Sequence, residues 1–485
     1  MPETPPSDPW WRDRMRPVQL LRTAWSRDPR GFAATIAAVL VALGAGVYLA
    51  YDALKRPPDV RNTQAVFEPK ETKIKKVVKL VNWPRYGYDR GRTRYLAAKG
   101  IKPPFKRIWK YGGRPLLEFP PIFVNGRLYG LDNNGHAFSL DADTGKVLWK
   151  RRVAQLNASA PVYAHQRIFV TNLVPGQVLA LNARSGKTEW KKELGTRTES
   201  SPLVVKRRVI FGDESGVLHA VDRRNGHSLW TAQLNGAIKA APAYQHGILY
   251  VGDYGGTMNA VNVRSGKIKW QASSQGLSFG RDGPFYSTPA VAFGRVYSGN
   301  NDGRVYSFEA KDGDLAWSHS TGGYVYSSPA VADTPNSDPT VYIGSYDGNL
   351  YAIDAKSGDS RWTQSAGGRV IGSVSAVGNI VYVAEFDDTT TTGFAMKDGR
   401  KVWEYGTGAY MPVISDGRRI YLTGYSSITG LQPFKPGAGK KKGKKQRAKG
   451  GQGSRARRGG ASHPQRGKSR SERSKRKEQR QPRRG

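Results

Sequence analysis

Residues 141–149 read Asp-Ala-Asp-Thr-Gly-Lys-Val-Leu-Trp, and the chain repeats this motif six more times, each copy ending at a tryptophan. The seven tryptophans are Trp149, Trp190, Trp230, Trp270, Trp317, Trp362 and Trp403. The intervals between them are 41, 40, 40, 47, 45 and 41 residues. A repeat of about 40–45 residues is typical of propellers and solenoids, in which each unit buries its apolar face against the next unit.

Within the motif, a glycine always stands four residues before the tryptophan, and six copies carry Asp, Asn or Glu eight residues before it. These glycines are Gly145, Gly186, Gly226, Gly266, Gly313, Gly358 and Gly399. The acidic or amide side chain can bind the backbone of a turn, and the glycine can adopt the positive φ that the turn requires. We expect the tryptophan to lie on the following strand and to dock over the turn and the neighbouring sheet. Burying one indole contributes at most about 4–6 kcal/mol.

A second turn signal recurs fourteen residues before the tryptophan, where six of the seven copies have a glycine and the last copy has Thr389. Stretches in which apolar and polar residues alternate, such as Ile248–Gly252, flank these turns. Such alternation predicts strands that are buried on one face. Each repeat therefore predicts four short antiparallel strands, which form one propeller blade.

Trp109 lies 40 residues before Trp149, in phase with the repeat, but Phe105 stands where the motif has glycine. Residues 410–434 read as three further strands with no tryptophan after them. Three strands and the isolated Trp109 strand would complete one more blade. We therefore predict an all-β fold over residues 83–434, an eight-bladed β-propeller with tryptophan docking motifs, closed by its N-terminal strand. Closure of this kind removes open sheet edges.

The motif resembles the pyrroloquinoline-quinone (PQQ) repeat, Ala-x-Asp-x-x-x-Gly-x-x-x-Trp, which is matched in full from Ala220 to Trp230 and from Ala352 to Trp362. The family that carries this repeat includes quinoprotein dehydrogenases and noncatalytic, BamB-like propellers. The resemblance implies the fold and not an activity, because the docking motif is structural. Residues 82–95 are similar to the segment that precedes the first outer strand in that family. We interpret this segment as a plug or clasp of the propeller.

In a quinoprotein dehydrogenase, the resemblance implies PQQ stacked in the central channel, a Ca²⁺ ion held by carboxylate and amide oxygens, and an aspartate base. The motifs transfer no catalytic residue to this chain, and we predict none. Weak candidates for the channel are Glu118, Glu199, Arg281 and Asp282, for each of which a structural or solvent-exposed role is the alternative. The chain has no cysteine, so the disulfide that covers the cofactor in many catalytic members cannot form. We predict no cofactor, or PQQ with calcium if the protein is an enzyme.

Other side chains also argue against a reactive centre. Small hydroxyl residues precede the inner strands, namely Ser200, Ser201, Ser287, Thr288, Ser327, Ser328 and Ser373. We expect them to line a polar, hydrated channel. The seven histidines are scattered and have no ligand spacing, so we predict no metal site.

The N-terminal part predicts attachment to a membrane. Residues 1–30 carry six arginines, and the next 21 residues, 31–51, carry no charge. As a helix, this run would be about 31 Å long, close to the thickness of the hydrocarbon core. We predict a cytoplasmic segment at 1–30, an uncleaved transmembrane signal anchor at 31–54 and a linker at 55–82. A cleaved signal peptide and a buried core helix are the alternatives.

The composition changes at Lys435. Residues 435–485 hold 21 Lys and Arg against two Glu, a net charge of +19, and the whole chain carries +39. With almost nothing apolar to bury, this tail is predicted to be disordered. It is either a solvated extension or an electrostatic contact for a polyanion.

These features favour a noncatalytic binding or scaffold protein of the cell envelope. We expect a monomeric propeller on a single-pass helix in the cytoplasmic (inner) membrane, with the propeller and the C-terminus outside the cytoplasm. Its expected partners are envelope proteins or anionic envelope polymers such as teichoic acids and anionic lipids. The alternatives are a PQQ-dependent dehydrogenase of alcohols or sugars, and a protein that binds polyanions or nucleic acid through its tail.

Overall fold

The computed structural model describes residues 29–54, 57–69, 81–276, 283–334, 337–410 and 413–435. The chain divides into two units, Met1–Lys435 and Pro436–Gly485, and every described residue belongs to the first. The tail expected at 435–485 therefore lies outside the described residues except for Lys435. Residues 1–28 of the expected cytoplasmic segment lie outside them as well.

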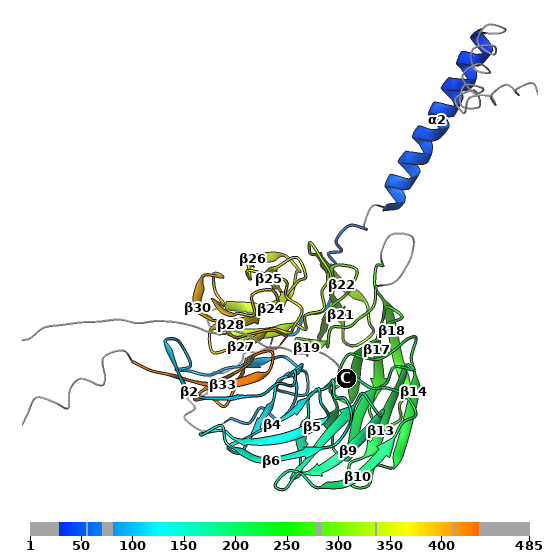
Figure 1. The fold of residues 1–485 in the computed structure, drawn as a ribbon. Coiled ribbons are helices and arrows are strands. Elements are labelled where there is room, and N and C mark those ends of the chain that lie inside the picture. The colour runs from blue at the N-terminus through cyan, green and yellow to red at the C-terminus, as the bar shows by residue number, and fades with distance from the viewer. Residues whose placement is uncertain are drawn as a thin grey trace, which may run out of the picture. The chain divides into compact units, whose positions relative to one another are not determined.

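Eight β-sheets are arranged as a ring of blades (Figure 1). Each blade follows the chain from its inner strand to its outer strand. Blade 1 comprises β3 (Ile122–Val124), β4 (Arg127–Asp132), β5 (His136–Asp141) and β6 (Val147–Arg152). Blade 2 comprises β7 (Val162–Ala164), β8 (Arg167–Asn172), β9 (Gln177–Asn182) and β10 (Thr188–Glu193). Blade 3 comprises β11 (Leu203–Val205), β12 (Arg208–Gly212), β13 (Val217–Asp222) and β14 (Ser228–Gln233).

The next four blades repeat this order. Blade 4 comprises β15 (Ala243–Gln245), β16 (Ile248–Gly252), β17 (Thr257–Asn262) and β18 (Ile268–Ser273). Blade 5 comprises β19 (Ala290–Ala292), β20 (Arg295–Gly299), β21 (Arg304–Glu309) and β22 (Leu315–Ser320). Blade 6 comprises β23 (Ala330–Thr334), β24 (Ser337–Gly344), β25 (Asn349–Asp354) and β26 (Ser360–Ser365). Blade 7 comprises β27 (Ser375–Val377), β28 (Ile380–Ala384), β29 (Thr391–Ala395) and β30 (Lys401–Tyr405).

Blade 8 joins the two ends of the propeller. Its first three strands are β31 (Ile414–Ser415), β32 (Ile420–Thr423) and β33 (Ser427–Pro433), and its outer strand is β2 (Phe105–Gly112). Strand β2 pairs antiparallel with β33, with Trp109 opposite Gly430. The predicted eight-bladed ring, closed by the Trp109 strand, is confirmed. One strand was not expected: β1 (Tyr95–Leu96) pairs in parallel with β27 and adds a fifth strand to blade 7.

The tryptophans of the repeat join each blade to the next. The indole Nε1 of Trp149 donates a 3.0 Å hydrogen bond to the carbonyl of Ala183 in blade 2. Gly186 lies directly beneath the ring, where a Cβ atom would come within 2.5 Å of the indole. Seven tryptophans bind a carbonyl of the next blade in this way, at 3.0–3.1 Å: Trp109, Trp149, Trp190, Trp230, Trp270, Trp317 and Trp362.

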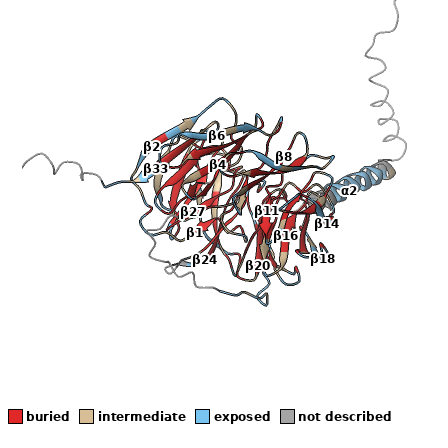
Figure 2. Ribbon diagram, turned by 90° about the horizontal axis from the view of Figure 1, so that it is seen from below, coloured by how far each residue is buried: buried red, intermediate tan, exposed pale blue. Residues whose placement is uncertain are grey.

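The eighth junction has a different structure because the motif turn is missing where the chain ends meet. Trp403 packs edge-on against Phe105, with the ring centroids 5.3 Å apart. An aromatic side chain therefore occupies the position that glycine holds in the other blades. The core lies between neighbouring sheets, as the buried inner and middle strands in Figure 2 show, while the outer strand β6 exposes four of its six residues.

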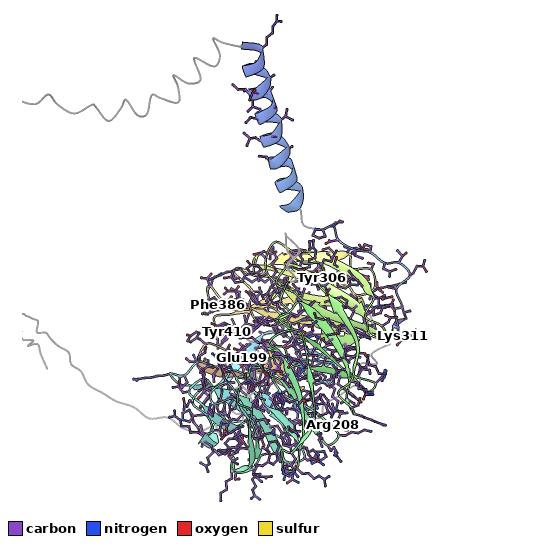
Figure 3. All side chains as sticks on the ribbon, turned by 90° about the vertical axis from the view of Figure 1, so that its right-hand side faces the viewer. Glu199, Arg208, Tyr306, Lys311, Phe386 and Tyr410 are labelled. Carbon is purple, nitrogen blue, oxygen red and sulfur yellow. The ribbon has the colours of Figure 1, made fainter. Side chains whose placement is uncertain are left out.

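The alternation of strand directions gives the propeller two distinct faces. The docking-motif turns lie on one face, which we call the motif face. The turns between second and third strands, and the loops that lead into the inner strands, lie on the other, which we call the mouth face. In Figure 3, Glu199, Phe386 and Tyr410 gather on one side of the propeller, away from Lys311 and Arg208.

Residues 57–68, which we call the strap, pack on blade 5. Arg61 forms an isolated bridge with Trp317, and Asn62 donates its backbone N–H to Ala316 at 2.8 Å. The buried Arg295 donates to the carbonyl of Ala65 at 2.7 Å. The expected linker 55–82 is therefore, in part, a packed segment, because backbone groups of the strap find partners on the outer strand β22 and on β20.

Helix α2 (Pro29–Leu54) contains the segment expected to be a signal anchor. Its described apolar side chains are exposed, with Val41 at 71% and Val47 at 70%. Within the described ranges, no helix has the combined length and apolar character that crossing a membrane requires.

The docking geometry can be tested with two glycines that both have positive φ. Gly313 (φ +88°) lies under Trp270, where a Cβ atom would come within 2.7 Å of the indole, whereas Gly367 (φ +98°) has no atom within 4 Å of that position. We expect Gly367→Ala to destabilise the protein by about 1–2 kcal/mol through its backbone alone. Gly313→Ala should cost about 1–3 kcal/mol more, because the indole must move. Denaturant unfolding measures both, and equal losses would contradict docking through the glycine.

Candidate functional site

Residues 81–96, which we call the plug, run along the inner strands and close the channel. Backbone N–H groups of five inner strands donate to carbonyl groups of the plug at 2.7–2.9 Å. These hydrogen bonds are Tyr163 to Pro84, Tyr244 to Arg90, Val291 to Gly91, Val331 to Thr93 and Ala376 to Arg94. A bridge between Trp83 and Phe123 adds blade 1. The interpretation of this segment as a plug agrees with these contacts.

Two arginines of the plug are fully buried beneath the channel. Arg92 donates to the carbonyls of Pro242 and Ser201, at 2.7 and 3.2 Å, and also to that of Tyr86. Arg94 donates to the carbonyls of Arg92 and Pro329, and its Nε and second terminal nitrogen have no partner among the described residues. Burial lowers the pKa of both guanidinium groups. The acid of the plug, Asp89, binds the backbone and hydroxyl of Thr93 instead.

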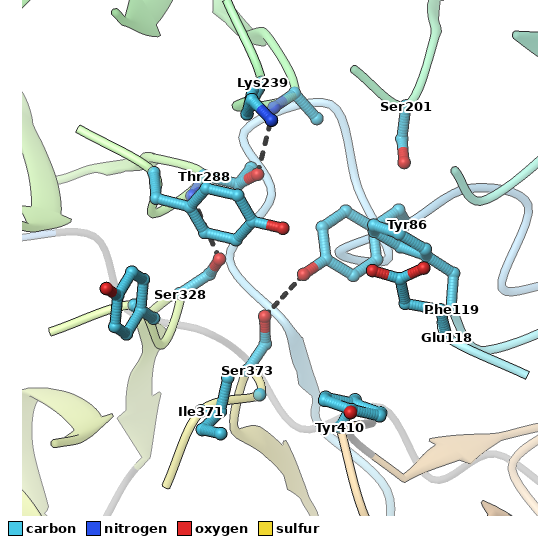
Figure 4. A pocket seen from close by; sticks show the side chains of 14 residues that line it. Tyr86, Glu118, Phe119, Ser201, Lys239, Thr288, Ser328, Ile371, Ser373 and Tyr410 are labelled. Atoms are coloured by element: carbon cyan, nitrogen blue, oxygen red, sulfur yellow. Dashed lines mark hydrogen bonds between the residues drawn. The ribbon is translucent and has the colours of Figure 1, made fainter. Parts of the chain in front are cut away.

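Tyr86 lies over these charges and forms the floor of a cavity. Its ring centroid is 4.9 Å from the guanidinium carbon of Arg94, and its hydroxyl shares a short hydrogen bond with Ser373 (Figure 4). Burial alone would raise the pKa of Tyr86, but the charge of Arg94 and the hydrogen bonds around the hydroxyl outweigh burial and lower it.

One residue from each blade surrounds the mouth of the channel, always four residues before the inner strand. This mouth ring comprises Glu118, Ala158, Glu199, Lys239, Tyr286, Tyr326, Ile371 and Tyr410. Six of these side chains line the cavity, all except Ala158 and Glu199. Tyr86, Phe119 and four hydroxyl residues line it with them. The ring is polarised: its carboxylates come from blades 1 and 3, and its aromatic side chains come from blades 5, 6 and 8.

The hydroxyl residues join blades rather than face bulk water. Ser201 accepts the N–H of Ala160 at 2.8 Å, Thr288 accepts that of Ala241 at 3.0 Å, and Ser328 accepts that of Thr288 at 3.0 Å. All three hydroxyl residues are at least 96% buried. These hydroxyls line the cavity, and because the centre of the ring is crowded, each also accepts a hydrogen bond from a neighbouring backbone. The expected hydration of the lining stays a prediction.

The charged groups at the mouth are mostly paired. Lys239 Nζ lies 2.9 Å from Glu199 Oε1 and 3.3 Å from Glu214 Oε1. Burial lowers the pKa of Lys239, but Glu199 and then Glu214 outweigh it, so the net pKa is raised. Glu118 has only a 3.2 Å hydrogen bond from Asn133, and burial raises its pKa.

Of the predicted channel residues, the structure brings two to this site. Glu118 lines the cavity and Glu199 forms an ion pair at its edge, whereas Arg281 and Asp282 lie outside the described residues. The sequence reasoning missed Tyr86, Lys239 and the mouth tyrosines. Counting four residues back from each inner strand would have found the tyrosines and Lys239.

Aromatic side chains continue from the cavity along the mouth face of blades 4 to 8. This aromatic rim comprises Tyr254, Tyr286, Tyr324, Tyr326, Tyr346, Phe386 and Tyr410. Tyr324 and Tyr346 each lie within 6.1 Å of Tyr326 between ring centroids, and Tyr324 is 50% exposed. The Arg369 guanidinium lies 5.2 Å from the Tyr346 ring and 5.6 Å from the Phe386 ring.

The family model described as outer membrane protein assembly factor BamB matches residues 106–238, 214–334 and 327–440. These matches cover more than half of the chain. The chain belongs to this family of PQQ-repeat, BamB-like propellers.

Three individual proteins are similar to this chain at low sequence identity. Quinate/shikimate dehydrogenase (quinone) of Acinetobacter baylyi is 28% identical over 102 residues, which is 18% of this chain and 12% of the relative. The crystal structure of BamB from Moraxella catarrhalis has a TM-score of 0.58 at 17% identity, over 68% of this chain and all of that one. Quinohemoprotein alcohol dehydrogenase from Comamonas testosteroni has a TM-score of 0.60 at 14% identity, over 72% of this chain and 80% of that one.

PQQ and calcium, which the catalytic branch of the PQQ-repeat family implies, do not fit the described cavity. Its volume is about 60 Å³, whereas sites for cofactor-sized ligands usually span about 300–1,000 Å³. The described residues hold no group of three or more His, Cys, Asp or Glu that could bind a metal ion. Glu118 is the single carboxylate among the cavity residues, and Tyr86 of the plug fills the centre below.

The raised pKa of Glu118 makes a prediction about stability. The folded protein holds this proton more tightly than the unfolded chain does, so ionisation opposes folding, and stability falls as pH rises through the folded pKa. We expect Glu118→Gln to raise the Tm at pH 7 by about 1–2 °C and to have little effect near pH 4. Glu199→Gln, which removes the partner of Lys239, should lower the Tm at pH 7. A Tm decrease for Glu118→Gln at pH 7 would contradict this account.

Proposed function

We propose that this chain is a noncatalytic, membrane-attached propeller that binds envelope proteins through the aromatic rim of its mouth face. The observation that carries the proposal is the composition of that rim. Tyrosine and arginine dominate the binding energy of protein interfaces, because each offers a large contact area together with polar groups. Here seven aromatic side chains and Arg369 form one continuous surface over five blades.

The central channel supports a binding role over a catalytic one. The plug takes hydrogen bonds from the inner strands and leaves a cavity of about 60 Å³. A substrate and a tricyclic cofactor together would need far more room. The rim, in contrast, reaches the surface, with Tyr324 50% exposed and the other six aromatic side chains half-buried. Its rings contact one another edge to face, which keeps them in place without a ligand.

Attachment to the cytoplasmic membrane through residues 31–54 is part of the proposal. Two features support it: the uncharged run from residue 31 to 51, and the exposure of Leu40, Val41 and Val47 on α2. A bilayer would bury these side chains at a gain of roughly 25 cal/mol per Å². The arginines of residues 1–30 favour a cytoplasmic N-terminus, which would place the propeller outside the cytoplasm.

The basic tail adds a second contact in this proposal. With a net charge of +19 it would bind anionic lipids or envelope polymers by releasing counterions, and such binding falls steeply as salt rises. If the tail were found in the cytosol, nucleic acid would become the alternative polyanion.

The rim can be tested with a photo-crosslinking residue placed by mutation. At position 324 in intact cells we expect one discrete adduct with an envelope protein, identified by mass spectrometry. Val147, on the outer strand of blade 1, is the matched control because it is 49% exposed against 50% for Tyr324. Tyr346→Ala should remove the adduct without changing the Tm by more than about 2 °C. The same adduct from both positions would argue against the rim.

A PQQ-dependent dehydrogenase is the second candidate, favoured by what the names of the similar proteins describe. PQQ and Ca²⁺ added to the purified chain, with alcohols or sugars and a dye acceptor, separate the two functions. We expect no reduction of the dye and no quenching of tryptophan fluorescence by PQQ. Substrate-dependent dye reduction would replace the binding role with an enzymatic one.

A further inference from the structure

Three hydroxyls at the bottom of the cavity have a proton to donate. Ser201, Thr288 and Ser328 each accept a backbone N–H through their oxygen. The hydroxyl of Ser328 also lies within hydrogen-bonding reach of Tyr86, whereas those of Ser201 and Thr288 have no acceptor among the described residues. A hydroxyl has one donor proton beside its acceptor lone pairs. All three residues line the cavity, so their protons can point into it (Figure 4). A buried donor without an acceptor is costly, which favours a ligand that supplies acceptors.

The same floor carries positive charge that nearby acids do not neutralise. Arg92 and Arg94 are fully buried and bind carbonyl groups, with no carboxylate partner among the described residues. Two nitrogens of Arg94 have no acceptor there. The ring of Tyr86 separates Arg94 from the cavity, so these charges act through the field at the floor and through the Tyr86 hydroxyl.

The remaining charges at the mouth limit the choice of ligand. Lys239 is engaged by Glu199 and Glu214, and Glu118 faces the cavity from blade 1. An anion must therefore bind on the side of Tyr86 and the hydroxyls, against some repulsion from Glu118. A volume of about 60 Å³ suits one such group and not a large molecule.

From this arrangement we propose that the floor of the cavity is an oxyanion site, formed by the hydroxyls of Tyr86, Ser201, Thr288 and Ser328, which binds a carboxylate or phosphate group. The group is either a free ion or the end of a longer ligand that lies across the aromatic rim. Several hydroxyl donors that line one small cavity are an arrangement that can bind an oxyanion. This site goes beyond the proposed function, which needs only the rim.

Isothermal titration calorimetry of the full chain at constant ionic strength, with chloride as the balancing ion, tests the site. The probes are acetate, its neutral isostere acetamide, and inorganic phosphate. We expect saturable binding of acetate or phosphate and no binding of acetamide. An N-acetylated tripeptide acid and its C-terminal amide distinguish the source: an acid that binds about tenfold more tightly than acetate indicates the end of a longer ligand, and equal affinities indicate a free ion.

Substitutions test whether the anion binds at the floor of the cavity. Tyr86→Phe keeps the ring over Arg94 and removes the hydroxyl, so it should weaken anion binding by about tenfold or more. Ser328→Ala should weaken it as well, and Glu118→Gln should strengthen it by removing the opposing charge. Tyr425→Phe is the control, because Tyr425 is 53% exposed and does not line the cavity. The Tm of each variant is measured in parallel.

Three results would overturn the proposal: no heat of binding with any anion, equal binding of acetate and acetamide, or unchanged affinity in Tyr86→Phe that keeps the wild-type Tm. None of these results bears on crosslinking from position 324. A failure of the oxyanion site is therefore distinguishable from a failure of the rim.

Discussion

The contact between an indole and the glycine of the next blade is the interaction on which this propeller depends. The indole covers the glycine and binds a carbonyl of the same turn, so one side chain supplies apolar burial and a hydrogen bond between blades. Glycine is required twice over, for its positive φ and for its lack of Cβ. The contact recurs at seven of the eight junctions, which fixes the distance between neighbouring sheets around the ring. Blade 8, built from both ends of the propeller, uses Phe105 against Trp403 at the remaining junction.

The docking contacts hold the blades together at their outer strands. The centre of the ring must therefore be filled by another segment. The inner strands have only two to five residues, and the plug accepts hydrogen bonds from their N–H groups. As a consequence, Arg92 and Arg94 are fully buried, and no carboxylate of the described residues pairs with them. Carbonyl groups from several blades bind these guanidinium groups, so the plug and the blades stabilise each other. The positive field that results lies under the cavity at the mouth of the channel.

Amino-acid identity can therefore vary more from blade to blade on the mouth face than on the motif face. Residues of the motif face are constrained by docking, whereas the residue four positions before each inner strand contacts the channel mouth and can differ from blade to blade. In this chain the variation separates carboxylates on blades 1 and 3 from tyrosines on blades 5, 6 and 8. A symmetric scaffold thus carries an asymmetric surface. Tyr324 and Tyr346 extend this surface toward solvent, and Arg369 lies beside them.

The sequence by itself determined the repeat, the number of blades and the closure, because these follow from local turn chemistry and from the spacing of Trp109 to Trp403. The plug was expected from the resemblance of residues 82–95 to the segment that precedes the first outer strand in the PQQ-repeat family. Only the tertiary structure decided what the centre contains. Ser201 and Ser328 lie far apart in the chain, and their partners belong to neighbouring blades. Tyr86, Arg94 and Ser373 meet because the ring closes over the plug, and closure is a long-range constraint that no spacing within one repeat encodes. The sequence did not predict the packing of the strap on blade 5 for the same reason, because its partners are more than two hundred residues away in the chain.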